Sequence, residues 1–218
     1  TNKQAIVDML ALLDRDQRVI VRITNSGYGV GEAGRFCTEE TPIRPVSLYG
    51  RDKVELEKTL LERHPAAISL RLATVFGMSP RMRLDLLVND FTYRAFTDRF
   101  IVLFESHFKR NFIHVRDVAR AFLHAIDGFE EMKGQIYNVG LSDANLSKLE
   151  LCQQIQKHLP NFMIHESNVG KDPDKRDYIV SNEKIERTGY KPAFSLDDGI
   201  RELVKGFAMI RNTKYSNI

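Results

Sequence analysis

The sequence predicts an α/β fold in which a parallel sheet with crossover helices adjoins a smaller α/β lobe. Two observations predict it. Helical and strand-like segments alternate over residues 1–80, and this alternation is typical of parallel strands joined by helices. Beyond residue 80 the segments become shorter and more mixed, so residues 81–218 are expected to form mainly the lobe, with some segments that could return to the sheet. The 218 residues are enough for one good core and a small appended lobe.

Four elements are predicted in the first part. Apolar residues recur at helical spacing near the start, and β-branched residues crowd both strand segments. Good helix formers fill the second helix, and the glycine-containing stretch 25–31 follows the first strand as a loop. The elements are a helix that contains Ile6, Met9, Leu10 and Leu13, a strand at 18–24, a helix at 47–63 and a strand at 67–73.

The second part is predicted to mix short strands and helices. Ser147 and Glu150 form a capping box that starts one helix. Ser195 is placed to cap the last helix, which is expected to reach about Ile210. The other predicted helices lie at 84–96 and 115–126, and the short strands at 100–104, 135–138 and 162–165.

Composition and charge favour a cytoplasmic protein. The formal charge of +3 is too small to indicate binding to nucleic acid or to a membrane by itself. Cys37 and Cys152 lie far apart and belong to no CxxC pair, which favours reduced thiols. We also expect no signal peptide and no membrane span, because no apolar run has the required length.

Neither a metal site nor a nucleic-acid interface is predicted. None of the six histidines stands at a metal-ligand spacing from cysteines or carboxylates. His114 lies within an apolar stretch and is predicted to be structural. One basic cluster lacks the interleaved aromatic residues of a nucleic-acid site. This cluster comprises Lys109, Arg110, Arg116 and Arg120.

The strongest chemical signal is Tyr49 four residues before Lys53, because this spacing puts both side chains on one face of a helix. A free tyrosine has a pKa of about 10, and a nearby ammonium favours the phenolate and lowers that pKa. Such a tyrosine can take a proton from a sugar hydroxyl while hydride leaves for a nicotinamide. Taken alone, however, a Tyr–Lys pair at this spacing is more often a solvated helix face.

Thr24 supports the catalytic interpretation. It ends a strand 25 residues before Tyr49, and its hydroxyl could hydrogen-bond both the phenol and a substrate oxygen. The alternative is an ordinary strand-end threonine that makes a local hydrogen bond.

Further segments follow in the order that one enzyme family shows. They are Thr24–Gly29, Thr38–Pro42, Tyr49 with Lys53, Arg71–Gly77, Arg110–Asp117, Tyr137–Gly140 and Gly189–Pro192. Together they cover nearly the whole chain and resemble the extended short-chain dehydrogenases/reductases, in particular the NAD-dependent nucleotide-sugar epimerase/dehydratase group.

The resemblance implies that the chain is the C-terminal part of a Rossmann-type parallel sheet with a small α/β substrate-binding lobe. Members of the family begin with a segment that carries a Gly-rich turn for the cofactor pyrophosphate. Gly27, Gly29 and Gly31 lack the spacing of that turn. We therefore expect the Gly-rich N-terminal half to be missing and the fragment by itself to be inactive.

The resemblance also implies a cofactor and a set of catalytic residues. Thr24, Tyr49 and Lys53 would be catalytic, and Tyr49, Lys53 and Ala73 would contact NAD. The residues that would contact the adenosine ribose, and so distinguish NAD from NADP, are expected in the missing part, so NADP is not excluded. Family members commonly dimerise through the helix that carries the Tyr–Lys pair, so a homodimer involving residues 47–63 is expected.

The two residues after Thr24 narrow the expected reaction. The 4,6-dehydratases of the family typically have acidic residues there, which eliminate water, whereas this chain has Asn25 and Ser26. The expected activity is therefore oxidation at C4 of a nucleotide-diphosphate sugar, as a 4-epimerase or a 4-dehydrogenase. A 4,6-dehydratase is less favoured. The alternative from another class is a catalytically inactive homologue that binds a nucleotide-sugar or serves in assembly.

The substrate contacts are expected from the same resemblance. Arg110 and Arg176 are candidate diphosphate clamps, because guanidinium groups make forked contacts to phosphate. The run 71–94 and the segment Asp174–Tyr178 resemble a bacterial branch close to GDP-manno-heptose 4-dehydrogenases of capsule polysaccharide biosynthesis, which favours a GDP-linked sugar. The full set of expected substrate-binding residues is Ser26, Thr74, Asn89, Arg110, Lys175 and Arg176.

Overall fold

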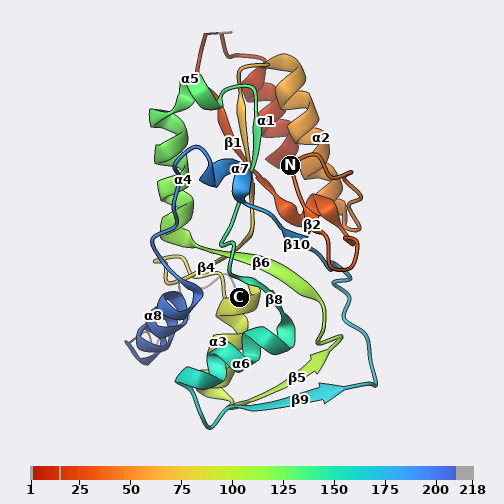
Figure 1. Cartoon of the computed structure of the whole chain (residues 1–218), viewed down its shortest axis with the longest axis vertical. Coiled ribbons are helices and arrows are strands. Elements are labelled where there is room, and N and C mark those ends of the chain that lie inside the picture. Colours follow the sequence, from red (N-terminus) through yellow and green to blue (C-terminus); the bar gives the residue numbers. More distant parts are fainter. Residues whose placement is uncertain (1, 15, 210–218) are drawn as a thin grey trace.

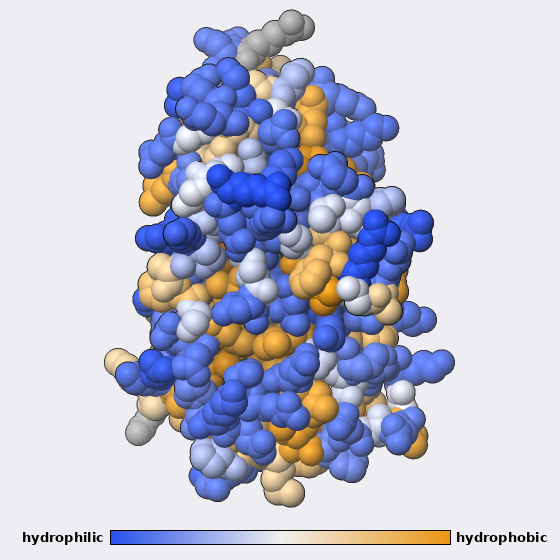
Figure 2. Space-filling view, viewed as in Figure 1, coloured by the Kyte–Doolittle hydropathy of each residue, from blue (hydrophilic) through white to orange (hydrophobic). Residues whose placement is uncertain are grey.

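The computed structural model describes residues 2–14 and 16–209, which form two regions stacked along the long axis of the molecule (Figure 1). One region holds a parallel sheet between helices, and the other holds helices packed on short strands. The chain crosses between the two regions several times. Figure 2 shows one face, where hydrophilic residues predominate and apolar residues gather in small patches.

The first region is built on three parallel strands in the order β1-β3-β7. These are β1 (Ile20–Thr24), β3 (Ile68–Leu72) and β7 (Ile136–Val139). In the register of the sheet, Thr24 pairs with Leu72, and Leu72 pairs with Val139. The carboxyl ends of the three strands therefore meet at one edge of the sheet, where open α/β sheets bind their ligands.

Helices cover both faces of this sheet. On one face α1 (Asn2–Leu10) and α2 (Leu48–Arg63) share a core cluster with Val21 and Ile23 of β1. On the other face α4 (Val115–Asp127) and α5 (Phe129–Met132) pack against the apolar residues of β3 and β7. The Ser47 hydroxyl caps the start of α2 by accepting a 3.1 Å hydrogen bond from the amide of Gly50. This cap, two residues before Tyr49, fixes the start of the helix at Leu48.

The second region has three strands with three long helices around them. Strand β6 (Lys109–His114) pairs in parallel with β4 (Thr74–Phe76) and antiparallel with β8 (Asn145–Ser147). The helices α3 (Leu87–Thr97), α6 (Lys148–His158) and α8 (Leu196–Met209) share one apolar core with these strands. A further parallel pair, β5 (Phe100–Phe104) and β9 (Met163–Ser167), lies at the far end (Figure 1).

Short elements connect the two regions near the carboxyl edge of the sheet. The 3-10 turn η1 (Asn25–Tyr28) follows β1 directly, and β2 (Phe36–Cys37) pairs in parallel with β10 (Ile179–Val180). Helix α7 (Glu183–Glu186) follows β10. The pairing of β2 with β10 brings the segment before residue 179 next to the loop that follows β1.

Most sequence-based expectations for the elements are confirmed. The structure has the predicted helix and strand around the Tyr–Lys pair, and Ser147 and Glu150 form the predicted capping box. The first helix, however, ends at Leu10, so Leu13 lies beyond it. Strand β6 was not predicted, because its charged residues hide the period-two pattern of a strand. The expected end of the last helix at Ile210 lies outside the described residues.

Within residues 2–14 and 16–209, no helix combines the length and the apolar character needed to span a membrane.

Candidate active site

Tyr49 and Lys53 lie one turn apart on α2, with the Lys53 Nζ 6.0 Å from the centre of the Tyr49 ring. Tyr49 is 52% exposed, so its phenol is accessible to a ligand, whereas Lys53 is only 9% exposed. Burial lowers the pKa of Lys53, and the charge of Arg22 on β1 lowers it further. The described part of the chain gives the Lys53 ammonium no hydrogen-bond partner. The pair therefore combines an open phenol with an ammonium that has free donors.

A chain of hydroxyl hydrogen bonds lies at the end of β1. The Thr24 hydroxyl donates to Ser26 Oγ at 2.9 Å and accepts from the Ser26 amide at 3.1 Å. Arg176 Nη1 donates to the same Ser26 Oγ at 2.5 Å, although the two residues are 150 positions apart in the sequence. The structure thus brings together three of the predicted site residues.

The segment 172–177 forms a loop that holds Arg176 in place. Asp174 accepts two forked hydrogen bonds from Arg176, 2.7 Å from Nε and 2.5 Å from Nη2. Burial acts to raise the pKa of Asp174, but the hydrogen bond from Arg176 and the charges of Arg110 and Arg176 outweigh it and leave that pKa lowered. The loop is anchored at its start by the largely buried Lys148, which pairs with Asp172.

Arg110 supports this loop from beneath. It is 1% exposed, its Nη1 donates to the carbonyl of Arg176, and its Nη2 lies 3.2 Å from the Asp174 carboxylate. Its role as a direct diphosphate clamp stays a prediction. The contacts present here hold the backbone and the carboxylate that position Arg176.

A cavity of about 640 Å³ lies between the start of α2 and this loop. Its volume falls in the range of small-molecule sites. Tyr49 lines one side, and Lys175 and Arg176 line the other. The remaining lining residues are Val46, Ser47, Pro173 and Asp174. Three predicted residues therefore line one cavity, namely Tyr49, Lys175 and Arg176, and Lys53 lies one helical turn from Tyr49 outside that lining.

Arg83 is a neighbour of Tyr49 that the sequence did not reveal. The hydrogen bond to Asp85 raises the pKa of Arg83 against the effect of burial, and the nearby Tyr49 phenol contributes in the same direction. Tyr49 also contributes to the raised pKa of Arg176. The guanidinium groups of Arg83 and Arg176 therefore both lie within electrostatic range of the Tyr49 phenol. The one signal in the sequence is Asp85, two residues after Arg83, because a carboxylate that close can hold the guanidinium in place.

The other predicted residues lie away from the cavity. The Ala73 amide donates to the carbonyl of Val139 at 2.9 Å, and Thr74 pairs with Phe112 in the β4–β6 ladder. Asn89 is buried, accepts a 3.1 Å hydrogen bond from the Gly77 amide and donates to the Arg83 carbonyl at 3.0 Å. Its visible role is to hold the segment that carries Arg83, and the substrate roles of Thr74 and Asn89 stay predictions.

Asn25 is an unusual member of this region. It follows Thr24 directly and is 1% exposed, yet neither its carboxamide oxygen nor its nitrogen has a hydrogen-bond partner among residues 2–14 and 16–209. A buried amide without a partner costs about 1–3 kcal/mol. The segment after Thr24 therefore carries a polar group whose hydrogen-bonding capacity is unused.

A buried ionic network fixes α2 on the sheet. The carboxylate of Glu57, one turn beyond Lys53, accepts hydrogen bonds of 2.7–3.0 Å from Arg71 and of 2.8 Å from Ser69. Burial opposes the charge of Arg71, but hydrogen bonds and the charge of Glu57 outweigh it and raise its pKa. Arg71 also donates to the Tyr28 hydroxyl at 3.0 Å. Helix α2, strand β3 and turn η1 are thereby tied together beneath the candidate site.

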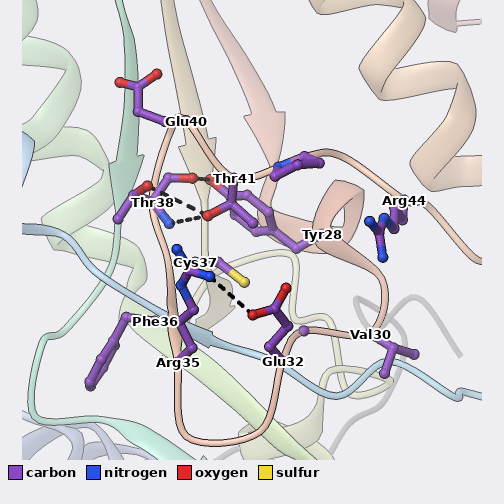
Figure 3. Close-up of a pocket in the computed structure, with 12 residues that line it drawn as sticks. Tyr28, Val30, Glu32, Arg35, Phe36, Cys37, Thr38, Glu40, Thr41 and Arg44 are labelled. Atoms are coloured by element: carbon purple, nitrogen blue, oxygen red, sulfur yellow. Dashed lines mark hydrogen bonds and ion pairs between the residues drawn. The ribbon is translucent and has the colours of Figure 1, made fainter.

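A second cavity, of about 170 Å³, lies within the loop 28–44 (Figure 3). Figure 3 shows Cys37 beside Glu32, which accepts a hydrogen bond from Arg35. Burial raises the pKa of the Cys37 thiol, and the charge of Glu32 raises it further, so this thiol is a poor nucleophile. Neither Tyr49 nor Lys53 lines this cavity.

The histidines and acidic residues form no metal-binding cluster of three or more within the part of the chain that the structure describes. His114 is fully buried, stacks on Phe194 and accepts a hydrogen bond from the Arg116 amide, which agrees with its predicted structural role.

Comparison with known proteins identifies the family. A family model described as "NAD dependent epimerase/dehydratase family" matches residues 2–140. The chain is 25% identical to a dTDP-D-glucose 4,6-dehydratase of Mus musculus, over 88% of this chain and 56% of that protein. It is 27% identical to UDP-glucuronate 4-epimerase 5 of Arabidopsis thaliana, over 84% of this chain and 46% of that protein. The chain thus spans about half the length of these curated relatives.

Solved structures show the same fold. A dTDP-glucose 4,6-dehydratase from Bacillus anthracis, in complex with NAD, matches with a TM-score of 0.81 at 20% identity, over 98% of this chain and 68% of that one. A UDP-glucuronic acid 4-epimerase from Bacillus cereus matches with a TM-score of 0.80 at 21% identity, over 95% and 66%. The predicted Rossmann-type α/β fold is therefore confirmed.

Proposed function

Because the chain belongs to the NAD dependent epimerase/dehydratase family, we propose that it serves in NAD(P)-dependent oxidation at C4 of a nucleotide-diphosphate sugar. One observation carries the proposal. The exposed side chain of Tyr49 lines a cavity of about 640 Å³ together with Lys175 and Arg176, and the Lys53 ammonium lies 6.0 Å from the centre of the Tyr49 ring. This arrangement offers a base at one side of a ligand and phosphate-binding cations at the other.

The residues present fit a nicotinamide cofactor. Lys53 is nearly buried and its ammonium has no hydrogen-bond partner among the described residues, so it can donate to the hydroxyls of a ribose. Tyr49, Lys53 and Ala73 would hold the nicotinamide end of the cofactor. When bound, the cofactor would supply the acceptor for the hydride from C4. Tyr49 would take the proton from the C4 hydroxyl, and Lys53 would stabilise the phenolate. Thr24 would share the hydrogen bond to the sugar oxygen. NAD is the proposed cofactor, and NADP remains an alternative.

The opposite side of the cavity suits a diphosphate. Arg176 and Lys175 would bind its oxygens, with Ser26 beside them, and Arg110 would hold the Arg176 backbone in place. The relatives are named for dTDP- and UDP-linked sugars. A GDP-linked sugar, such as a manno-heptose, is our finer proposal and rests on the resemblance of residues 71–94 and Asp174–Tyr178.

The outcome of the reaction follows from the residues after Thr24. Neither Asn25 nor Ser26 is a carboxylate, so the acid and base that would eliminate water are absent from those two positions. We therefore favour a 4-epimerase or a 4-dehydrogenase over a 4,6-dehydratase, although the mouse relative carries the dehydratase name.

We further propose a setting for this activity. Residues 1–80 would form the catalytic part of the cofactor domain, and residues 81–218 mainly the substrate lobe, with β7 in the sheet of the former. The exposed Leu48 in the first turn of α2 supports a homodimer that covers this helix. Two free cysteines support a cytoplasmic location.

A substrate panel tests the proposal. The full-length protein is incubated with NAD⁺ and UDP-, dTDP- and GDP-linked sugars, and products are identified by mass and NMR. The proposal expects a 4-keto sugar with stoichiometric NADH, or a C4 epimer without net NADH. A 4-keto-6-deoxy sugar as the main product, formed by elimination of water across C5 and C6, would identify a dehydratase instead. A protein that binds no dinucleotide at all would be the inactive binding homologue.

A further inference from the structure

Asp174 places a carboxylate in the wall of the cavity of about 640 Å³, beside Lys175 and Arg176. A fixed negative charge at that wall repels an anionic ligand. Burial acts to raise the pKa of Asp174, but the hydrogen bond from Arg176 and the charges of Arg110 and Arg176 leave that pKa lowered, so the side chain is an anion at neutral pH. The cavity wall therefore carries an anion of its own at the place proposed for the phosphates.

The carboxylate of Asp174 occupies the donors that Arg176 would offer to a phosphate. It accepts hydrogen bonds of 2.7 Å from Nε and 2.5 Å from Nη2. These two nitrogens form one fork of the guanidinium, and a fork matches two oxygens of a carboxylate or of a phosphate. The remaining nitrogen, Nη1, donates to Ser26 Oγ. Asp174 therefore lies where a phosphate would make its forked contact with Arg176.

The same carboxylate also lies against the buried Arg110. This residue is 1% exposed and does not line the cavity, and its Nη2 lies 3.2 Å from Asp174 Oδ1. Within residues 2–14 and 16–209, neither Nε nor Nη2 of Arg110 has a hydrogen-bond partner, so the contact with Asp174 is an ion pair without an aligned hydrogen bond. Buried donors without partners are unfavourable. An anion whose oxygens are better placed than those of Asp174 would therefore gain the free donors of Arg110.

The contact between Asp174 and Arg176 is open enough to be exchanged. The two side chains keep 33% and 27% of their surface exposed. Ion pairs that water reaches contribute little to stability, because solvent screens them. The diphosphate of a nucleotide-sugar carries more negative charge than one carboxylate, so its attraction to the neighbouring guanidinium groups is greater. A phosphate of such a ligand is therefore able to replace the carboxylate.

We propose that Asp174 is an exchangeable counter-ion of the diphosphate site, which holds Arg110 and Arg176 together in the free protein and gives way to a phosphate of the nucleotide-sugar. This inference rests on the proposed function. Without a ligand, the carboxylate keeps two neighbouring guanidinium groups from repelling each other. With a ligand, it competes for the same donors and weakens binding, which favours release of a product that carries the same diphosphate. A residue that only positioned Arg176 would strengthen binding instead.

Calorimetric titration of the full-length protein with GDP, and separately with UDP, tests the sign of this effect. Asp174→Asn should lower the Kd of both about 5- to 10-fold, because the competing charge is gone. Asp174→Ala should change the Kd in the same direction, and it is a second variant without an amide that could contact the guanidinium groups. Asp90→Asn is the matched control, since it removes a carboxylate that pairs with Arg94 on α3 at 2.9 Å, and it should leave the Kd unchanged.

Titration with NAD⁺ distinguishes the two diphosphates that the full-length protein would bind. The Asp174 variants should bind NAD⁺ as tightly as the wild type, and an equal tightening for NAD⁺ would overturn the assignment to the nucleotide-sugar. Unchanged or weaker binding of GDP and UDP by Asp174 variants that circular dichroism shows to be folded would overturn the proposal, and Asp174 would then be a support that positions Arg176. A wild-type protein that bound neither GDP nor UDP would contradict the proposed function itself, which is a different result.

Discussion

The two sides of the candidate site are held by different kinds of contact. On the α2 side, the Glu57–Arg71 pair is almost dry, with both side chains 6% exposed. On the loop side, the Asp174–Arg176 pair keeps 33% and 27% of its side-chain surface exposed. A dry ion pair is strongly coupled to folding, whereas a half-open one can exchange its partners with water or ligand. The difference favours a rigid support for the proposed base on α2 and an adaptable loop opposite it, where we propose that the diphosphate binds.

Breaking the dry pair should give the largest effect on stability. Glu57→Ala leaves the Arg71 guanidinium buried without its counter-ion, and such a loss costs about 3–5 kcal/mol. Chemical denaturation of the wild type and the variant measures the free energy of unfolding. Glu57→Gln is the control, because it keeps the shape and part of the hydrogen bonding. A loss below about 1 kcal/mol for the alanine variant would mean that this pair does not anchor α2.

Breaking the open pair should affect binding instead of folding. Arg176→Ala should raise the KM for the nucleotide-sugar about 10- to 100-fold, because a charge-assisted contact to phosphate is lost. Its free energy of unfolding should change much less than that of Glu57→Ala. Steady-state kinetics of the full-length protein provides the measurement. An unchanged KM together with a lowered kcat would show that Arg176 does not bind the nucleotide-sugar and instead positions other groups of the site.

Acid should act on the loop side through Asp174. Its folded-state pKa lies below the ordinary value, so it adds stability at higher pH, and that contribution disappears as the pH falls below about 4 through the lowered pKa. Unfolding followed from pH 5 to pH 2 should show this loss in the wild type. Asp174→Asn should be less stable near pH 5 and should show a flatter acid limb. Parallel curves of stability against pH for the two proteins would show that Asp174 does not cause the loss of stability in acid.

The smallest effect is expected where the two sides meet. Ser26 Oγ accepts hydrogen bonds from both Thr24 and Arg176, so it links the strand end to the loop. Ser26→Ala should lower kcat/KM by about 3- to 10-fold, as expected for neutral and charge-assisted hydrogen bonds lost together. A double-mutant cycle with Arg176→Ala measures the coupling. Fully additive effects would show that the Ser26 link has no functional consequence.

The α2 side could be predicted from the sequence because its signals are local. Tyr49 and Lys53 are four residues apart, and the helix around them follows from good helix formers and the Ser47 cap. Thr24 was found because it ends an apolar strand. These features depend on spacing within one element, which a single sequence displays directly.

The loop side could be predicted only in part, because its contacts join distant residues. Arg176 is predicted from the family resemblance and from the affinity of guanidinium for phosphate. Its hydrogen bond to Ser26 spans 150 positions, and no periodic pattern in the sequence predicts that contact. Arg110 was proposed as a direct clamp, and the structure gives it a supporting place beneath Asp174. Arg83 and Tyr49 lie in different parts of the chain, and the sequence does not show that these two segments come close together.

The central claim is that Tyr49 is the base on the rigid side of the site. Single-turnover reduction of NAD⁺ by the nucleotide-sugar, followed at the NADH absorbance in the full-length protein, tests it most directly. Tyr49→Phe removes one oxygen atom, and we expect the rate to fall at least about 100-fold, within the range of a lost general base. Tyr93→Phe removes the same atom from a tyrosine that packs against Phe207 away from the cavity, and it should keep the wild-type rate. Near-wild-type reduction by Tyr49→Phe would contradict the account.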